Sequence, residues 1–201
     1  MADGRAAFFL MNKVRIRQVL RRKRRAIPRA KRQQAAKALL RKALPLLRHY
    51  HRVAFYFPLG EEIDPSYVFK AAVKQKKKVY LPVLQGKQLY FTSSEAHAWK
   101  KNRFGIPEPQ GEKISPRNLD LVFVPLVGFD RAKHRLGMGG GFYDRTFAFL
   151  RHRKYWRAPK LVGLAFDEQE VDILPAEPWD IQLDDVITPN LWRDCHTNDI
   201  N

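Results

Sequence analysis

Two helical patterns open the chain before the spacing of its apolar residues changes. Apolar positions recur with an imperfect helical period from Asn12 to Ala26, and again from Arg29 to His49. Pro28 suits the first turn of the second helix, whereas Pro45 inside it predicts an early end or a kink. The pattern therefore predicts a helical segment within residues 1–50.

Short and nearly all-apolar runs follow, which are typical of strands buried on both faces of a parallel sheet. Helical patterns separate some of them, from Pro65 to Gln75 and from Phe142 to Leu150. PEPQGEK (107–113) reads as a loop that passes over a site. The predicted strands are VAFYF (53–57), KVYLPVL (78–84), QLYFT (88–92), LDLVFVPLV (119–127), KLVGLAF (160–166) and DDVITP (184–189).

This alternation of strands and helices predicts an α/β fold with three layers. We expect an open, mostly parallel sheet with helices on both faces, Rossmann-like, with an N-terminal helical segment. The length suits one domain, residues 1–201, with the basic helices of residues 1–50 packed on it.

Ligands of open parallel sheets bind beyond the carboxyl ends of the strands. Three polar or glycine-rich stretches follow predicted strands and are therefore candidate site segments. They are PLGEEID (58–64), RLGMGGGFYDR (135–145) and FDEQE (166–170).

The charge of the chain is strongly positive and unevenly distributed. The formal net charge is +18, Asp3 is the only acidic residue before Arg52, and RRKRR (Arg21–Arg25) places five cations in a row. Such a stripe attracts polyanions, including nucleic acids. A solvated helix face is the alternative, and no aromatic residues interleave the basic run as in single-strand binders.

Other sequence features favour a cytoplasmic protein without a membrane partner. No apolar run is long enough to span a bilayer, and AAFFLM (6–11) is too short for a secretory signal. The single cysteine, Cys195, excludes an internal disulfide and has no metal-type spacing around it.

The glycine-rich stretch carries the strongest chemical signal. Four of the five residues 137–141 are glycine, yet no Gly-Lys-Ser/Thr follows, and the third glycine of a dinucleotide fingerprint would fall at Phe142. Between a strand and a helix, its amides suit an anion, with Arg135 and Arg145 adding charge. Asp144 suits a magnesium ion shared with phosphates. From these residues alone, a phosphate site and a structural turn both stay open.

RLGMGGGFYD (135–144), preceded by PLVGFD (125–130), closely resembles the signature of 5-formyltetrahydrofolate cyclo-ligases, also called methenyltetrahydrofolate synthetases. Where that family often has a glycine before the loop, this chain has RAKH (131–134). The resemblance covers nearly the whole chain. Further segments fall in the family's order, namely the basic N-terminal helix, EEID (61–64), KKVYLPV (77–83), FGIPEP (104–109) and PWD (178–180).

The resemblance implies an enzyme that uses ATP and magnesium to close 5-formyltetrahydrofolate, with or without a polyglutamate tail, into 5,10-methenyltetrahydrofolate. Phosphorylation of the formyl oxygen makes a leaving group, and ADP and phosphate are released. No dedicated nucleic-acid partner is then expected. A basic nucleic-acid-binding protein is the alternative function. A sugar-phosphate or CoA enzyme is a third option, but it would not explain the segments FGIPEP and PWD.

The same resemblance assigns roles to residues of this chain. Those matching the ATP-binding positions are Lys13, Arg17, Arg135, Leu136, Gly137, Met138, Gly139, Gly140, Gly141, Phe142 and Tyr143. The folate positions are Phe57, Glu62 and Phe104, together with Met138 to Phe142. Asp144 and Asp180 match the magnesium ligands.

Structural explanations stand beside these roles. Lys13 and Arg17, one helical turn apart, also fit a solvated helix face. For Asp180 a helix N-cap or a turn aspartate fits as well. Glu62 also fits a surface acid at a strand end, and aromatic residues such as Phe57 and Phe104 also serve ordinary core packing.

Overall fold

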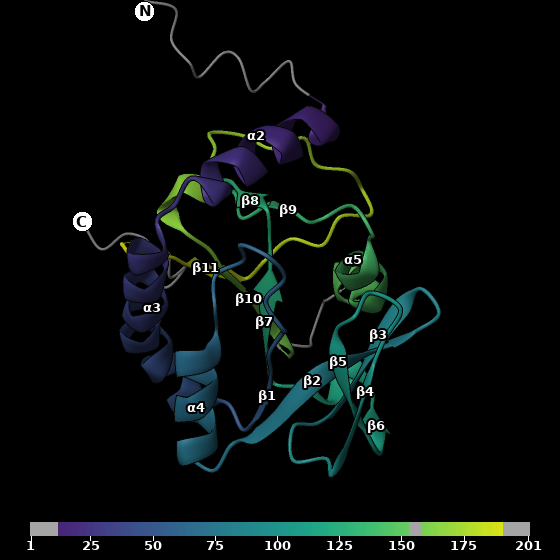
Figure 1. The fold of residues 1–201 in the computed structure, drawn as a ribbon. Helices are drawn as coiled ribbons and strands as arrows, with labels where there is room; N and C mark the ends of the chain where they lie inside the picture. The colour runs from purple at the N-terminus through teal and green to yellow at the C-terminus, as the bar shows by residue number, and fades with distance from the viewer. Residues whose placement is uncertain (1–11, 153–157, 191–201) are drawn as a thin grey trace, which may run out of the picture.

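The computed structural model describes residues 12–152 and 158–190, so AAFFLM and Cys195 lie outside the described part. A seven-stranded sheet forms the centre, with the strand order β11-β10-β7-β1-β2-β3-β6 (Figure 1). Its strands are β1 (Arg52–Ala54), β2 (Lys78–Gln85), β3 (Gln88–Ser93), β6 (Lys113–Ile114), β7 (Leu121–Pro125), β10 (Lys160–Leu164) and β11 (Asp185–Ile187).

Five neighbouring strands of this sheet are parallel, and β3 and β6 add an antiparallel edge. The predicted α/β class with a mostly parallel sheet is therefore confirmed. Numbered along the chain, the parallel strands lie in the order 2-1-3-4-5, which is the second doubly wound order rather than the 3-2-1-4-5-6 of dinucleotide-binding folds. The order reverses between β1 and β7, where such folds bind ligands.

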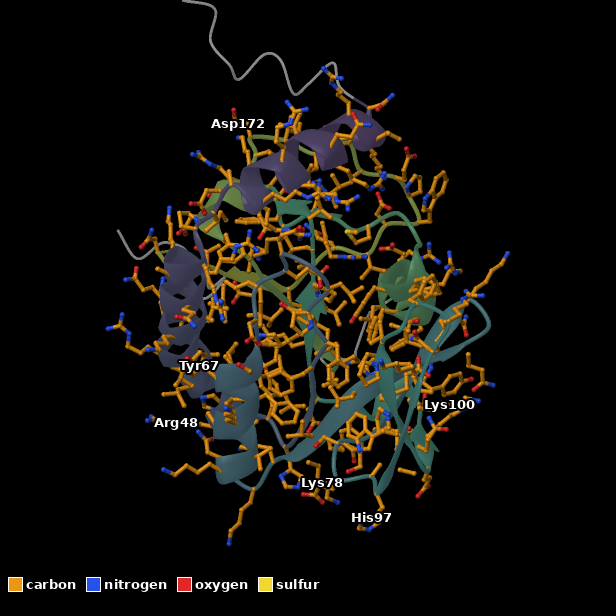
Figure 2. The ribbon with its side chains drawn as sticks, in the orientation of Figure 1. Arg48, Tyr67, Lys78, His97, Lys100 and Asp172 are labelled. Atoms are coloured by element: carbon orange, nitrogen blue, oxygen red, sulfur yellow. The ribbon has the colours of Figure 1, made fainter. Side chains whose placement is uncertain are left out.

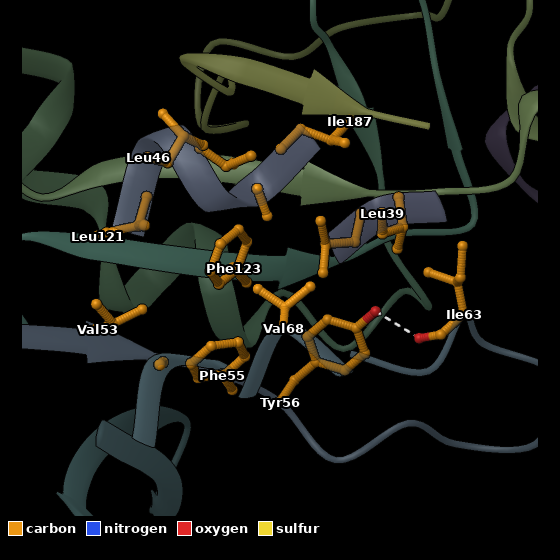
Figure 3. Close-up of a cluster of buried hydrophobic side chains, with 14 of the residues drawn as sticks. Leu39, Leu46, Val53, Phe55, Tyr56, Ile63, Val68, Leu121, Phe123 and Ile187 are labelled. Carbon is orange, nitrogen blue, oxygen red and sulfur yellow. Dashed lines mark hydrogen bonds between the residues drawn. The ribbon is translucent and has the colours of Figure 1, made fainter. Parts of the chain in front are cut away.

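Helices cover both faces of the sheet because successive strand residues point to opposite sides. Val53 and Phe55 contact the core under α3 (Arg29–His49) and α4 (Ser66–Lys74), whereas Ala54 belongs to the opposite core. Figure 3 shows the first core, where the buried Tyr56 hydroxyl donates to the Ile63 carbonyl at 2.7 Å. The opposite core packs against α5 (Phe142–Thr146) and the 3-10 helix η2 (Ala148–His152).

The helix predicted from Arg29 to His49 is confirmed as α3, and another predicted helix differs at its end. Pro45 causes no early end of α3, because Leu46 and Leu47 just beyond it are buried against the sheet. The helix expected from Phe142 to Leu150 ends at Thr146 and continues as η2. Packing of apolar residues therefore outweighs the local preference for a break at Pro45.

The prediction of a loop over 107–113 was wrong. Pro107–Gln110 forms β5, which pairs with β4 (Ala98–Lys101) in a two-stranded antiparallel ribbon. Prolines are tolerated in such an edge ribbon because their missing N–H can face away from the partner strand. Glu108 joins the ribbon to the sheet, since its buried carboxylate accepts the Leu84 amide at 2.8 Å.

Helix α2 (Lys13–Arg25) lies across the small hairpin of β8 (Gly128–Phe129) and β9 (Arg135–Leu136), as Figure 1 shows. Ile16 and Leu20 pack there in a small separate core. Arg24 continues the same i, i+4 face and is only 1% exposed, so the expected solvated face does not include it. Arg22, Lys23 and Arg25 are exposed.

Exposed basic side chains surround the molecule. Figure 2 shows Arg48 and Lys100 at the surface on opposite sides of the fold. Within the described residues, no helix combines the length and apolar character needed to cross a membrane.

Candidate functional site

One cavity of about 1020 Å³ lies at the switch point of the sheet. Tyr56 and Phe57, just beyond β1, and Pro125, at the end of β7, contribute to its wall. The structure brings all the predicted site residues to this cavity. They are Lys13, Arg17, Phe57, Glu62, Phe104, Arg135, Leu136, Gly137, Met138, Gly139, Gly140, Gly141, Phe142, Tyr143, Asp144 and Asp180.

The glycine loop has a backbone that other residues adopt only with strain. Gly139 has φ +101° and Gly141, the residue before α5, has φ +63°. A side chain at Gly139 would also approach the Arg17 guanidinium, whose Nε donates to the Gly137 carbonyl at 2.8 Å. The loop and α2 are therefore held together at the cavity, although their residues lie 120 positions apart.

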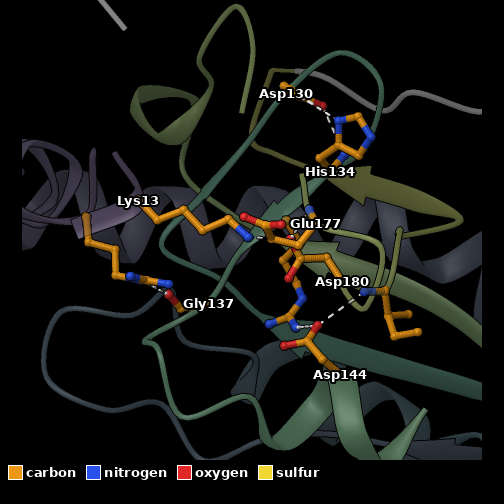
Figure 4. A network of polar contacts seen from close by, with 10 residues as sticks. Lys13, Asp130, His134, Gly137, Asp144, Glu177 and Asp180 are labelled. Carbon is orange, nitrogen blue, oxygen red and sulfur yellow. Dashed lines mark hydrogen bonds and ion pairs between the residues drawn. The ribbon is translucent and has the colours of Figure 1, made fainter. Parts of the chain in front are cut away.

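Cations pair with both aspartates proposed as magnesium ligands (Figure 4). Lys13 Nζ lies 2.5 Å from Asp180 Oδ2, and Arg135 Nη2 lies 2.7 Å from Asp144 Oδ1. Asp180 also accepts the Glu177 amide at 2.8 Å, which is the contact of a turn aspartate. Asp180 therefore acts as a turn aspartate, and this contact leaves its other oxygen open to a second role.

The carboxylate oxygens of the two aspartates are suitable ligands for a magnesium ion. Magnesium is commonly bound by one or two carboxylates together with phosphate oxygens and waters. Asp144 Oδ2 and Asp180 Oδ1 accept no hydrogen bond from the described residues, so each carboxylate keeps an oxygen for a ligand. The described chain contains no cluster of three or more His, Cys, Asp or Glu side chains suited to a metal.

Glu62 forms the acidic wall of the cavity on the side of β1. Its Oε2 accepts the Leu59 amide at 3.0 Å. Burial raises the pKa of the Glu62 carboxyl, while the Leu59 amide and the positive charge of Arg24 act in the opposite direction. Burial also raises the pKa of Tyr143, which faces the same cavity.

Aromatic and apolar side chains line the mouth of the cavity. Phe104, at the tip of the β4–β5 ribbon, packs edge-on against Phe142, the first residue of α5, with 5.9 Å between ring centroids. Phe104, Met138 and Trp179 are 54%, 49% and 59% exposed, which is unusual for large apolar side chains. Phe57 packs against the core under α3 and α4 and also contacts Trp99 of the ribbon, so core packing and a place on the cavity wall hold together for this residue.

Sequence reasoning missed part of the cavity wall. Glu108 accepts the Asn102 side-chain amide at 2.7 Å, and together they shape the ribbon tip next to Phe104. No periodic signal marks these two residues because their pairing depends on the ribbon. Other lining residues that were not predicted are Tyr56, Leu59, Pro82, Leu84, Gln88, Leu89, Ile106, Pro125, Ala148, Arg151, Glu177 and Trp179.

FDEQE, the third candidate segment, does not line the cavity. Its Asp167 accepts from the Asn190 side chain at 2.9 Å, and Glu168 pairs with Lys31. Gln169 is buried and donates to the Leu126 and Val127 carbonyls. This segment therefore supports the fold rather than the site.

The departure RAKH leaves the hairpin before the glycine loop intact. Lys133 adopts φ +65°, a conformation that glycine accepts without strain. The Asp130 carboxylate compensates by accepting the His134 amide at 2.9 Å and by contacting the His134 ring at 2.9 Å (Figure 4). β8 and β9 consequently pair in register up to Arg135.

Comparison with known proteins gives a consistent result. A model of the 5-formyltetrahydrofolate cyclo-ligase family matches residues 10–189. The 5-formyltetrahydrofolate cyclo-ligase of Haemophilus influenzae is 37% identical over 181 residues, covering 86% of this chain and 95% of that protein. That of Escherichia coli K12 is 34% identical over 185 residues, covering 87% of this chain and 100% of that protein.

Solved structures agree. The solution structure of 5,10-methenyltetrahydrofolate synthetase from Aquifex aeolicus matches with a TM-score of 0.80 and 28% identity, covering 95% of this chain and 96% of that one. A synthetase of the same name from Mycoplasma pneumoniae matches with a TM-score of 0.72 and 24% identity, covering 90% and 100%, which supports the fold.

Proposed function

The chain belongs to the 5-formyltetrahydrofolate cyclo-ligase family, and from this premise we propose how its cavity carries out the family's reaction. That reaction is the ATP-dependent closure of 5-formyltetrahydrofolate to 5,10-methenyltetrahydrofolate. The observation that carries the proposal is that one cavity has both a cationic, glycine-lined side and an acidic, aromatic side.

Closure requires the formyl oxygen to leave, and a formamide oxygen is a poor leaving group. We assign the cavity the task of holding the γ-phosphate of ATP beside that oxygen, so that phosphoryl transfer releases ADP. The second folate nitrogen then attacks the formyl carbon, loses its proton and expels phosphate. In such chemistry the protein mainly positions the reactants and offsets negative charge.

On the ATP side, Lys13, Arg17 and the loop amides are assigned to the phosphates. Arg17 already bonds the loop through Gly137, and its remaining N–H donors suit phosphate oxygens. Arg135 fixes Asp144 by their ion pair. Asp144 and Asp180 would hold a magnesium ion, which supplies charge neutralisation for the phosphates when bound.

On the folate side, Glu62 is assigned to the pterin, whose N–H groups suit a carboxylate acceptor. Phe57 and Phe104 offer flat apolar surfaces to the rings. A polyglutamate tail would meet Lys100, Lys101 and Arg103 on the ribbon, which line a groove next to the cavity. Replacing these three by Gln should raise KM for a polyglutamylated substrate more than for the monoglutamate.

The direct experiment mixes the protein with 5-formyltetrahydrofolate and MgATP and follows the near-ultraviolet absorbance of the methenyl product. Product formation that depends on ATP supports the proposal. Absence of product from the folded protein, together with tight nucleic-acid binding at physiological salt, would favour the alternative function instead. The cytoplasmic location expected from the sequence stays a prediction.

A further inference from the structure

The turn that joins β4 to β5, residues 102–106, brings Phe104 to the cavity. The Phe104 side chain is more than half exposed. Its ring meets Phe142 edge-on and has the Arg103 guanidinium carbon 5.0 Å from its centroid. A fully buried core residue touches many more neighbours. The place of this ring therefore depends more on the backbone of its turn than on packing around it.

Asn102 holds the turn from inside. Its side-chain Oδ1 accepts the amides of Phe104 at 2.9 Å and of Ile106 at 3.1 Å. Its backbone amide donates to the Ile106 carbonyl, and its backbone carbonyl accepts the Gly105 amide, both at 2.9 Å. Gly105 adopts φ +75°, which only glycine accepts readily. The conformation of the turn thus depends on one side chain that binds two of its amides.

Glu108 anchors Asn102 to the central sheet. Asn102 Nδ2 donates to Glu108 Oε1 at 2.7 Å, and the same oxygen accepts the Leu84 amide of β2 at 2.8 Å. Glu108 is only 8% exposed, so water competes little for these two bonds. A continuous path of hydrogen bonds consequently runs from β2 through two side chains to the amide of Phe104.

We propose that Asn102 is a positioning residue for the folate side of the cavity: anchored by Glu108, it sets the place of the Phe104 ring and thereby the affinity for the flat rings of the substrate. Aromatic contacts depend on the separation and tilt of the rings, so a displaced turn weakens them. Within the described residues, no hydrogen bond of Asn102 reaches α2 or the glycine loop. The inference rests on the proposed function only for the identity of the bound rings.

The first variant is Asn102→Ala, which removes three side-chain hydrogen bonds and adds no charge. Gln110→Ala removes an exposed amide side chain from the same ribbon and is the matched control. The first readout is hydrogen–deuterium exchange of the Phe104 and Ile106 amides, followed by NMR. It needs neither ligand nor turnover, so it decides the structural part of the inference even if the protein fails to cyclise folate.

In Asn102→Ala these two amides should exchange about tenfold faster or more, while the amides of β4 keep their wild-type rates. KM for folate should rise by up to about tenfold, the value of one well-placed aromatic contact, and KM for ATP should change little. Phe104→Ala should raise KM for folate by a similar factor. In that background Asn102→Ala should add little, because both changes act through the same ring. Gln110→Ala should stay close to the wild type.

Asn102→Asp tests the anchor, and it decides if Asn102→Ala does not fold. This change keeps an acceptor for the two amides but sets a second carboxylate against Glu108 Oε1. It should raise KM for folate and not KM for ATP. Adding Glu108→Gln should recover part of the loss, because a glutamine amide can donate to the new carboxylate.

Wild-type exchange of the Phe104 and Ile106 amides in folded Asn102→Ala overturns the inference. Equally faster exchange throughout β4 also overturns it, since the residue would then support the whole ribbon. Equal rises in KM for both substrates, or full additivity with Phe104→Ala, exclude a role through the ring. In folded Asn102→Asp, an unchanged KM for folate or no recovery on adding Glu108→Gln refutes the anchoring by Glu108.

Discussion

Replacing Arg17 by alanine tests whether α2 serves the nucleotide. The Arg17 guanidinium bonds the Gly137 carbonyl and lies next to Gly139, so it faces the backbone that we assign to the phosphates. A hydrogen bond with a charged partner contributes about 1.5–3 kcal/mol. Loss of one such contact to phosphate corresponds to roughly tenfold to a hundredfold in affinity.

We therefore expect Arg17→Ala to raise KM for ATP within that range and to change KM for folate far less. Lys13→Ala should show the same preference, because Lys13 lies one helical turn away on the cavity side of α2. Initial rates of methenyl product formation, with one substrate varied and the other saturating, give both constants. Arg15→Ala is the matched control, since Arg15 is exposed on the same helix.

The reasoning fails if Arg17→Ala raises both constants equally, which would mean that the helix only supports the fold. It also fails if Arg15→Ala has the same effect, because general charge would then explain the result. Arg17→Lys should recover only part of the loss, since an ammonium keeps the charge but lacks the planar fork of a guanidinium. Thermal unfolding of each variant shows whether the fold is retained.

Three further predictions concern the rest of the site. Glu62→Gln should leave KM for ATP unchanged but raise KM for folate by roughly tenfold or more, whereas the control Glu61→Gln should not raise KM for folate. An unchanged folate KM in Glu62→Gln would leave Glu62 as a surface acid. Excess chelator should abolish turnover and Mg²⁺ should restore it, and full activity in chelator would contradict the roles of Asp144 and Asp180. When glutamine replaces the exposed cations Arg22, Lys23 and Arg25, turnover should stay nearly normal and retention on nucleic acid at low salt should weaken. A collapse of activity in the folded variant would place this basic run in the substrate site.

The sequence predicted the local elements well because their signals are local. Apolar runs indicated the parallel strands, and the glycines of 137–141 indicated a turn or a phosphate site, with Gly139 and Gly141 adopting positive φ in the structure. The loop motif and its order with EEID and PWD also indicated the family, which the comparisons confirm. The roles of the individual site residues stay predictions, although all of them line one cavity.

Local pattern was insufficient where distant segments determine the structure. PEPQGEK was expected as a loop, but its residues Pro107–Gln110 form a strand because Ala98–Lys101 pairs with them and Glu108 anchors them to β2. Pro45 was expected to cause an early end or a kink, and burial of the residues beyond it keeps α3 continuous to His49. In both cases tertiary contacts outweigh a local preference of the backbone.

What the sequence determined by itself was the set of chemical groups: a basic helix, a glycine loop, a glutamate after a strand and two aspartates. Their meeting point was decided by the order of the strands and by the path of α2. Lys13 reaches Asp180 across 167 positions of the chain, and the buried Arg24 side chain donates to the Leu126 carbonyl across 102 positions. The spacing of apolar and polar residues along the chain depends only on neighbours a few positions away. Burial and charge pairing depend instead on which distant segments the fold packs together.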